Sequence, residues 1–294
     1  MSKIKKVEPP APTLLHCPAK INLGLHVGPL DPDGFHPIQT IFLRTSLYDH
    51  LYIKPASTFS LSCSDPSIPN DARNLIAKAY KAYFAKVPSP PAYEIHLHKS
   101  IPWGAGFGGG SSNAAEFLKF LHQQNIPATP GFSELLVIAK ELGSDIPFFM
   151  HSGSYFAEGR GELLSPLGSV PTLPIILAGT ATPLATAKIF RIYDSTSPVE
   201  LTLFPVSQVY KMITENNGWG LKNFIRNDLQ AVVEKEWPEM LKVRTLLENS
   251  GADFVSMSGS GFVYFGIYSS VQIRDLALQT LKNELPFVEG VDTL

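Results

Sequence analysis

Cysteine and charged side chains are scarce in this sequence. Only two cysteines, Cys17 and Cys63, occur among 294 residues, and they do not form a C-x-x-C pair. Such usage excludes a disulfide-rich secreted scaffold and favours buried, reduced thiols in a cytoplasmic protein. Charged residues make up 17% of the chain and the formal net charge is −2. The only basic cluster is the short run at residues 3–6, so we expect no nucleic-acid surface.

Long apolar runs are also missing. No stretch of about 18 consecutive apolar residues occurs, and the first residues lack the apolar core and cleavage site of a signal peptide. We therefore expect neither export nor a membrane span. Eight histidines lie between residues 16 and 151, but no H-E-x-x-H pair is present. The spacing predicts no protein-bound metal site.

Glycine, by contrast, is concentrated in one segment. Residues 101–115 read Ile-Pro-Trp-Gly-Ala-Gly-Phe-Gly-Gly-Gly-Ser-Ser-Asn-Ala-Ala, with five glycines in seven positions. The residues that follow place apolar side chains at helical spacing, at Ala114, Phe117, Leu118 and Leu121. A glycine loop that leads into a helix N-terminus forms an anion site, because unpaired N–H groups and the helix dipole converge there. The expected anion is a phosphate chain.

Other interpretations of this segment exist. A glycine cluster can be a flexible linker, with Ser111 and Ser112 as helix caps. The pattern Gly104-x-Gly106-x-x-Gly109 matches the dinucleotide fingerprint, which also requires a βαβ unit. Residues 93–98 could supply its first strand, but the turn signals at 125–131 fall where the second should run. The P-loop pattern fails, since no Lys-Ser or Lys-Thr follows the glycines.

The pattern of apolar residues and turn signals predicts an α+β protein with hairpins rather than a doubly wound sheet. Expected strands lie at residues 14–17, 21–27, 38–44, 48–54, 93–98, 154–157, 173–178, 254–257, 263–267 and 287–288. The segments 38–44 and 48–54 could pair with each other. Expected helices lie at 74–85, 111–124, 132–142, 186–193, 206–215, 229–234, 240–250 and 271–283. Gly143 is expected to end one helix as a left-handed C′ glycine.

Residues 102–115 resemble the second motif of the galactokinase, homoserine kinase, mevalonate kinase and phosphomevalonate kinase (GHMP) superfamily. Three more segments agree: residues 18–23 with 33–40, residues 143–149 (Gly-Ser-Asp-Ile-Pro-Phe-Phe), and residues 257–261 (Met-Ser-Gly-Ser-Gly). The resemblance implies a ribosomal-protein-S5-like N-terminal domain at residues 1–165, which binds ATP. It also implies a ferredoxin-like C-terminal domain at residues 166–294, with the substrate in the cleft between them.

Within this superfamily, Pro-Ala-Lys-Ile-Asn at 18–22 and Asp-Gly-Phe-His at 33–36 are similar to the branch with a cytidine diphosphate substrate. That resemblance implies ATP-dependent phosphorylation of the 2-hydroxyl of 4-diphosphocytidyl-2-C-methyl-D-erythritol, in the non-mevalonate isoprenoid pathway. Mg²⁺ is implied as the companion of ATP, with no assigned protein ligand. We expect a monomer or weak homodimer that binds only small molecules.

Residue roles follow from the same resemblance. Lys20 and Asp145 correspond to the catalytic lysine and aspartate, although taken alone they would be read as a solvated lysine and a turn cap. The implied substrate residues are Asn22, Phe35, His36, Thr186 and Phe190, with Phe35 replacing the more usual Tyr. The implied nucleotide residues are Pro102, Gly104, Ala105, Gly106, Phe107, Gly108, Gly109, Gly110, Ser111, Ser112, Asn74 and Lys99. Backbone N–H groups of residues 106–112 are expected to hold the phosphates.

Three alternatives to this function remain at the level of sequence. The first is another kinase of the superfamily, with homoserine or mevalonate as substrate. The second is a non-catalytic relative that binds a nucleotide and acts as a regulator. The presence of both Lys20 and Asp145 weighs against it. The third is a nicotinamide-dependent dehydrogenase, which the missing βαβ context disfavours.

Overall fold

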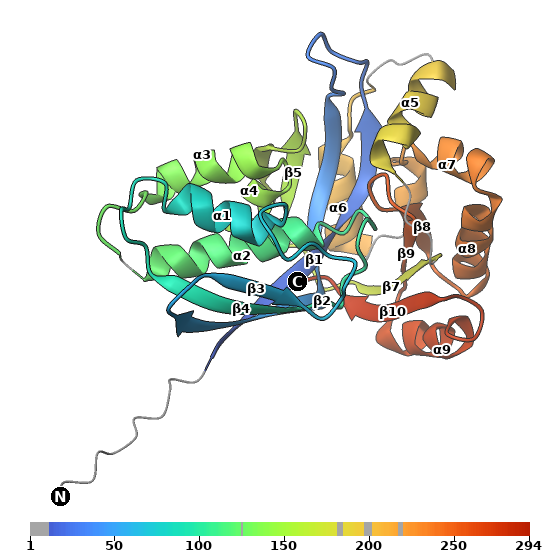
Figure 1. Ribbon diagram of the computed structural model, residues 1–294. Coiled ribbons are helices and arrows are strands. Elements are labelled where there is room, and N and C mark those ends of the chain that lie inside the picture. The colour runs from blue at the N-terminus through green and yellow to red at the C-terminus, as the bar shows by residue number, and fades with distance from the viewer. Residues whose placement is uncertain (1–11, 125, 181–184, 197–201, 217–219) are drawn as a thin grey trace, which may run out of the picture.

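The computed structural model describes residues 12–124, 126–180, 185–196, 202–216 and 220–294 (Figure 1). The basic run at residues 3–6 lies outside this part. Two sheets organise the fold, one built from residues 13–166 and one from residues 174–292. The α+β prediction is confirmed.

The first sheet is built around two long antiparallel strands, β1 (Thr13–Val27) and β2 (Ile38–Ala56). β1 pairs along one edge of β2. The opposite edge is shared, because one end of β2 pairs with β4 (Ala92–His98) and the other with β5 (Tyr155–Glu158). The sheet is completed by β3 (Ser60–Cys63), parallel to β4, and β6 (Leu163–Pro166), antiparallel to β5.

The length of β1 and β2 corrects the sequence prediction. Each had been expected as two separate strands, of which 38–44 and 48–54 could have paired with each other. Instead, each is one continuous strand, and the two pair with each other along nearly their whole length. Irregular register at Pro18/Ala19 accommodates the proline and two extra residues of β2 within the ladder. The break between the expected strands is therefore a bulge, not a turn.

Helices α1 (Leu75–Tyr83), α2 (Gly109–Gln123), α3 (Phe132–Leu142) and α4 (Ile146–Met150) pack on one side of this sheet (Figure 1). α3 has the predicted bounds. Gly143 ends this helix, as predicted, and its N–H donates to the Ala139 carbonyl. Its φ of 170° is extended, however, and not the expected left-handed conformation. α4 was not predicted, because its five apolar residues are too few to show a period.

The second sheet has the order β10-β7-β9-β8, with all neighbours antiparallel. Its strands are β7 (Pro174–Gly179), β8 (Phe254–Met257), β9 (Val263–Ile267) and β10 (Phe287–Asp292). Between β7 and β8 lie α5 (Thr186–Thr196), α6 (Val206–Asn216), η1 (Leu221–Asn223), α7 (Gln230–Glu236) and α8 (Pro238–Asn249), and α9 (Val271–Leu281) precedes β10. This sequence of strand, helices, hairpin, helix and strand is the ferredoxin-like pattern.

Strand β1 contributes to two hydrophobic cores. Cys17 packs with α1–α4 in the first core. From Ala19 to Val27 its apolar side chains pack in the second core, with β7, β9 and the helices of the C-terminal half. Three apolar side chains of the glycine loop, Ile101, Ala105 and Phe107, join that second core. The side chains of β1 therefore pack against both the glycine loop and the second sheet, and hold their relative positions.

Candidate active site

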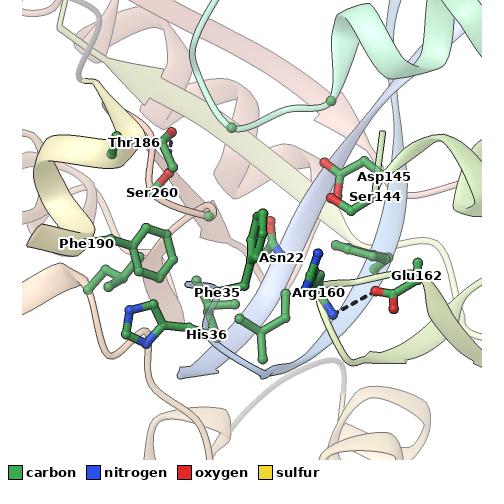
Figure 2. Close-up of a pocket in the computed structure, with 18 of the residues that line it drawn as sticks. Asn22, Phe35, His36, Ser144, Asp145, Arg160, Glu162, Thr186, Phe190 and Ser260 are labelled. Atoms are coloured by element: carbon green, nitrogen blue, oxygen red, sulfur yellow. Dashed lines mark hydrogen bonds between the residues drawn. The ribbon is translucent and has the colours of Figure 1, made fainter. Parts of the chain in front are cut away.

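A cleft of about 1200 Å³ lies where the two halves meet. Its walls come from β1, the start of β2, the glycine loop, the α3–α4 connection, the β5–β6 turn, α5 and the turn at 259–260. The predicted catalytic pair and all five predicted substrate residues line it: Lys20, Asp145, Asn22, Phe35, His36, Thr186 and Phe190. Figure 2 shows Asp145 and Phe190 on opposite sides of this space.

Lys20 and Asp145 form an ion pair in the cleft, with 3.3 Å between Nζ and Oδ2. Lys20 lies on β1, and Asp145 is the residue immediately before α4. The lysine side chain is 5% exposed and the carboxylate 29% exposed. The Lys20 ammonium also donates to Asn22 Oδ1 at 2.6 Å and lies 4.7 Å from the centroid of the Phe42 ring. A largely buried cation thus faces a carboxylate that remains accessible from the cleft.

The Asn22 amide is held in one orientation. Its Nδ2 donates to Thr40 Oγ1 at 3.2 Å, and that hydroxyl donates to the Gly24 carbonyl at 2.5 Å. Because Thr40 receives from Nδ2, Asn22 Oδ1 is directed at Lys20. The Asn22 backbone N–H donates to Ser258 Oγ, which ties β1 to the third glycine segment.

The glycine loop packs backbone against backbone on residues 258–261. Gly104, Gly106 and Gly108 have φ between 67° and 78°, a region that favours glycine. A Cβ on Gly106 would lie 2.5 Å from the Ser258 carbonyl oxygen, and one on Gly261 would overlap the Ala105 carbonyl. Glycine is therefore needed at Gly106 and Gly261, because a Cβ on either residue would overlap the backbone of the other segment. The sequence interpretation, which gave the glycines to the phosphates alone, missed this reason.

The glycine loop does lead into a helix N-terminus, as predicted, but α2 begins at Gly109, two residues before the expected start. The Ser112 N–H donates to the Gly108 carbonyl at 2.8 Å, so it is not available to a phosphate. That part of the prediction is wrong. The N–H groups of Gly109, Gly110 and Ser111, in the first turn, have no partner within a helix.

Ser112 has a different feature of interest. Its side chain is fully buried, and its Oγ has no hydrogen-bond partner among the described residues. Burial of a hydroxyl without a partner is costly, so such an atom is a candidate contact for a bound ligand. Ala105 and Phe107, which were also assigned to the nucleotide, point into the second core. Only their backbone can face a nucleotide.

Aromatic rings line the other end of the cleft. The Phe190 ring of α5 stacks on His36, with centroids 5.0 Å apart and 24° between the planes. His36 Nδ1 lies 2.8 Å from the Gly28 carbonyl oxygen, and Nε2 lies 3.1 Å from Asp194 Oδ1. Phe35 is 50% exposed, and the Arg160 guanidinium lies 3.6 Å from its ring centroid. Figure 2 shows Phe35 and Phe190 facing the same space.

Two other predicted contacts have structural partners of their own. Asn74 caps α1: its Oδ1 accepts from the Ile76 N–H, and its Nδ2 donates to the Pro69 carbonyl. Lys99 Nζ lies 2.5 Å from Asp49 Oδ2, and both side chains are buried. Neither Asn74 nor Lys99 lines the cleft. Thr186, by contrast, lies at its edge, where its hydroxyl is 2.8 Å from Ser260 Oγ.

Within the described residues, no group of three or more His, Cys, Asp or Glu side chains is arranged to hold a metal ion. Cys17 and Cys63 are free thiols, and burial raises the pKa of Cys17 strongly. No described helix is long and apolar enough to cross a membrane.

Comparison with known proteins assigns the chain to a family. Residues 74–153 match the model of the GHMP kinases N terminal domain. A 4-diphosphocytidyl-2-C-methyl-D-erythritol kinase from Salinibacter ruber is 36% identical over 92% of this chain and 95% of its own. The same-named protein from Desulfotalea psychrophila is 37% identical over 87% and 86%. The chain belongs to the 4-diphosphocytidyl-2-C-methyl-D-erythritol kinase family.

Solved structures agree with this assignment. A crystal structure of 4-(cytidine 5'-diphospho)-2C-methyl-D-erythritol kinase superposes with a TM-score of 0.80, at 29% identity, over 96% of this chain and 99% of that one. A homoserine kinase from Cytophaga hutchinsonii gives a TM-score of 0.72 at 16% identity, over 99% and 97%. The second match shows the shared GHMP kinase fold alone. The predicted family and the prediction of an ATP-dependent kinase are confirmed.

The cleft of this kinase also contains charged residues that the sequence analysis did not assign to the site. Arg160 and Glu162 come from the β5–β6 turn, Lys140 from the end of α3, and Asp194 from α5. Arg160 N donates to Glu162 Oε2 at 2.7 Å (Figure 2). These residues belong to no motif of the sequence. Only the folded chain, which brings β5–β6 and α5 to the same cleft, identifies them.

Proposed function

We propose that the chain transfers the γ-phosphoryl group of ATP to the 2-hydroxyl of 4-diphosphocytidyl-2-C-methyl-D-erythritol. The observation that carries this proposal is the Lys20–Asp145 pair, which lies in one cleft with the glycine loop and the aromatic end. Phosphoryl transfer needs held phosphates, neutralised charge and an aligned acceptor hydroxyl. In the proposed complex the glycine loop holds the phosphates, Lys20 neutralises charge, and Asp145 and the aromatic end align the acceptor.

Asp145 is the proposed base that accepts the proton of the attacking hydroxyl. The Lys20 ammonium, 3.3 Å away, offsets negative charge on the transferred phosphoryl group. Asn22 restrains Lys20 through the 2.6 Å hydrogen bond to its Oδ1. Preorganised charges of this kind lower the barrier because they need no rearrangement during the reaction.

The phosphates of ATP are proposed to lie against the first turn of α2 and the backbone of the glycine loop. The unpaired Ser112 hydroxyl supports this position, because a phosphate oxygen or Mg²⁺ would give it a partner. A hydroxyl oxygen is a hard ligand of the kind that Mg²⁺ accepts, and Mg²⁺ when bound neutralises phosphate charge. Asn74 and Lys99 remain proposed neighbours of the adenosine.

The cytidine end is proposed to lie between Phe35 and Phe190, with His36 and Thr186 beside it. Stacking on an aromatic face suits the one flat surface of this polar substrate. The exposure of Phe35 and the position of both rings on the lining of the cleft support this assignment. In the proposed complex, residues 33–36, which resemble this branch in particular, contact the cytosine ring that distinguishes its substrate.

The remaining assignments concern the whole molecule. We propose an ATP-binding domain at 1–165 and a second domain at 166–294. The sheets support this division, because β6 ends at Pro166 and β7 begins at Pro174. A cytoplasmic monomer or weak homodimer that binds no nucleic acid remains our proposal, consistent with the net charge of −2.

The decisive experiment compares substrates. ADP release from ATP is measured with 4-diphosphocytidyl-2-C-methyl-D-erythritol, homoserine and mevalonate, and phosphorus NMR locates the new phosphate. We expect kcat/KM for the diphosphocytidyl substrate to exceed that of the others at least 10³-fold, because only it can stack on the aromatic end. Faster turnover of homoserine or mevalonate would overturn the proposal, as would a phosphate on another hydroxyl.

A further inference from the structure

The residue opposite Lys20 on the neighbouring strand is an arginine. Lys20 on β1 and Arg44 on β2 are partners in the β1–β2 register, and opposite residues of an antiparallel pair lie on the same face of the sheet. Arg44 is nevertheless outside the cleft lining and 8% exposed. The sequence analysis gave it no role, and the proposed reaction does not use it.

Arg44 binds the carbonyl end of α4. Its Nη2 donates to the Phe148 carbonyl at 2.6 Å and also to the His151 carbonyl, and its Nη1 donates to the Gly153 carbonyl. The guanidinium carbon lies 4.2 Å from the centroid of the Phe148 ring. Carbonyls at the end of a helix lack partners within it, and a planar guanidinium can satisfy several of them at once.

The two cations therefore hold opposite ends of one short segment. Lys20 pairs with Asp145, which directly precedes α4, and Arg44 binds the carbonyls at and just beyond the end of α4. A five-residue helix is not stable by itself, so its position depends on such contacts and on its buried side chains. A shift of the carbonyl end would be transmitted to Asp145 through a single helical turn.

The surroundings favour an arginine at this point. Burial lowers the pKa of Arg44, while the nearby Glu116 carboxylate on α2 opposes that effect. Burial also raises the pKa of Glu116, which pairs with Lys119 at 2.6 Å. Lysine at position 44 would place one ammonium where three carbonyls now receive separate N–H groups.

We propose that Arg44 is a positioning residue, which sets the Asp145 carboxylate against the acceptor hydroxyl by fixing the far end of α4. This rests on the proposed role of Asp145 as the base. Misplacement of a reacting group by about 1 Å can lower turnover about 10²-fold without changing how substrates bind.

The test uses Arg44→Lys and Arg44→Gln in the full-length chain, with Arg274→Lys as the matched control. Arg274 is a second buried arginine, in α9, which donates to the Val291 carbonyl at 2.9 Å and to Asp292 far from the cleft. We measure kcat, both KM values and Tm. We expect kcat to fall about 10- to 100-fold in both Arg44 variants, with KM values within about threefold. Arg274→Lys should lower Tm while kcat stays within twofold.

A double-mutant cycle with Asp145→Asn separates the two proposals. If Arg44 acts through Asp145, Arg44→Lys should change the residual single-turnover rate of Asp145→Asn less than twofold. Multiplied losses would overturn the role of Arg44 alone, whereas near-normal turnover of Asp145→Asn would overturn the base assignment itself. Unchanged kcat in the folded Arg44 variants, an equal loss of kcat in Arg274→Lys, or failure of both Arg44 variants to fold would also overturn the positioning role.

Discussion

Asp145 pairs with Lys20, is accessible from the cleft and directly precedes α4. Replacing it with asparagine keeps the size of the side chain and removes its capacity to accept a proton. We expect kcat of Asp145→Asn to fall about 10²- to 10⁴-fold, the usual contribution of a general base. The Kd for ATP, measured by calorimetry, should change little because the proposed phosphate site lies at α2. Turnover within a few-fold of wild type would rule out Asp145 as the base.

Phe35 and Phe190 carry the second prediction at the scale of single residues. Loss of either ring should raise the KM for the diphosphocytidyl substrate roughly 5- to 150-fold, since stacking contributes about 1–3 kcal/mol. The KM for ATP should stay within a few-fold. Phe35→Tyr keeps the stacking face and should be close to neutral.

Phe132→Ala is the control for these ring deletions, because Phe132 is 45% exposed and does not line the cleft. Its substrate KM should equal that of the wild type. An unchanged substrate KM in Phe35→Ala, with activity retained, would place the cytidine pocket elsewhere. Phe190→Ala is expected to have the larger effect of the two, since it also removes the ring on which His36 stacks.

The role of a residue was predictable from the sequence only where that residue belongs to a motif. Lys20 and Asp145 could be assigned because the segments around them resemble a known family, and both line the cleft. Arg44 and Asp49 could not, because their partners are distant in the chain. Buried Asp49, for example, accepts from the N–H groups of Ser100 and Ile101 and from Asn113 Nδ2. Such contacts leave no local pattern in the sequence.

At the scale of elements, the glycine loop allows a sharper test than a bulky substitution. A side chain on Gly109 would press on Ile101 and on Lys99 Nζ, so Gly109→Val would disturb the buried Lys99–Asp49 pair as well as any ligand. Gly106 and Gly110 separate these effects. Gly106 has φ +78° and abuts the Ser258 carbonyl, whereas a Cβ on Gly110 would meet only Leu75, at an ordinary 3.6 Å.

We therefore expect Gly106→Ala to weaken ATP binding at least 10-fold and to destabilise the fold by about 1–3 kcal/mol, from backbone strain and overlap. Gly110→Ala should bind ATP within about threefold of wild type. Isothermal calorimetry and thermal unfolding measure the two effects. Normal ATP affinity in Gly106→Ala would show that contact between the two glycine segments is not needed for the nucleotide site.

Helices and strands with a full period were predicted closely. α3, β8 and β9 have the predicted bounds. The failures concern elements whose existence depends on neighbours. β3 and β6, each four residues long, are edge strands that pair with β4 and β5, and α4 is held by Arg44 and by buried rings. A local pattern does not contain those neighbours. The same holds for the long ladder of β1 and β2, where pairing overrides Pro18.

At the scale of the whole molecule, β1 joins the two halves, because Ala19 to Val27 pack in the second core although the strand belongs to the first sheet. The other end of the chain adds a link: Thr293 pairs with Thr45 of β2, and Leu294 N donates to the Arg44 carbonyl at 3.0 Å. A cleft between two halves that share a strand cannot be opened by separating them as rigid, independent domains. We therefore expect the described parts of the chain to unfold as one cooperative unit.

Matched core deletions test this expectation. Ile21 lies only in the second core and Ile95 only in the first, and both are fully buried. Ile21→Ala and Ile95→Ala should each lower the free energy of unfolding by about 2–5 kcal/mol. Hydrogen exchange of peptides from α2 and β9, followed by mass spectrometry in increasing urea, reports the two halves separately. In a cooperative molecule each substitution shifts both peptides to the same midpoint. If Ile95→Ala shifted only the α2 peptide, the halves would be independent, and the shared strand would not couple them.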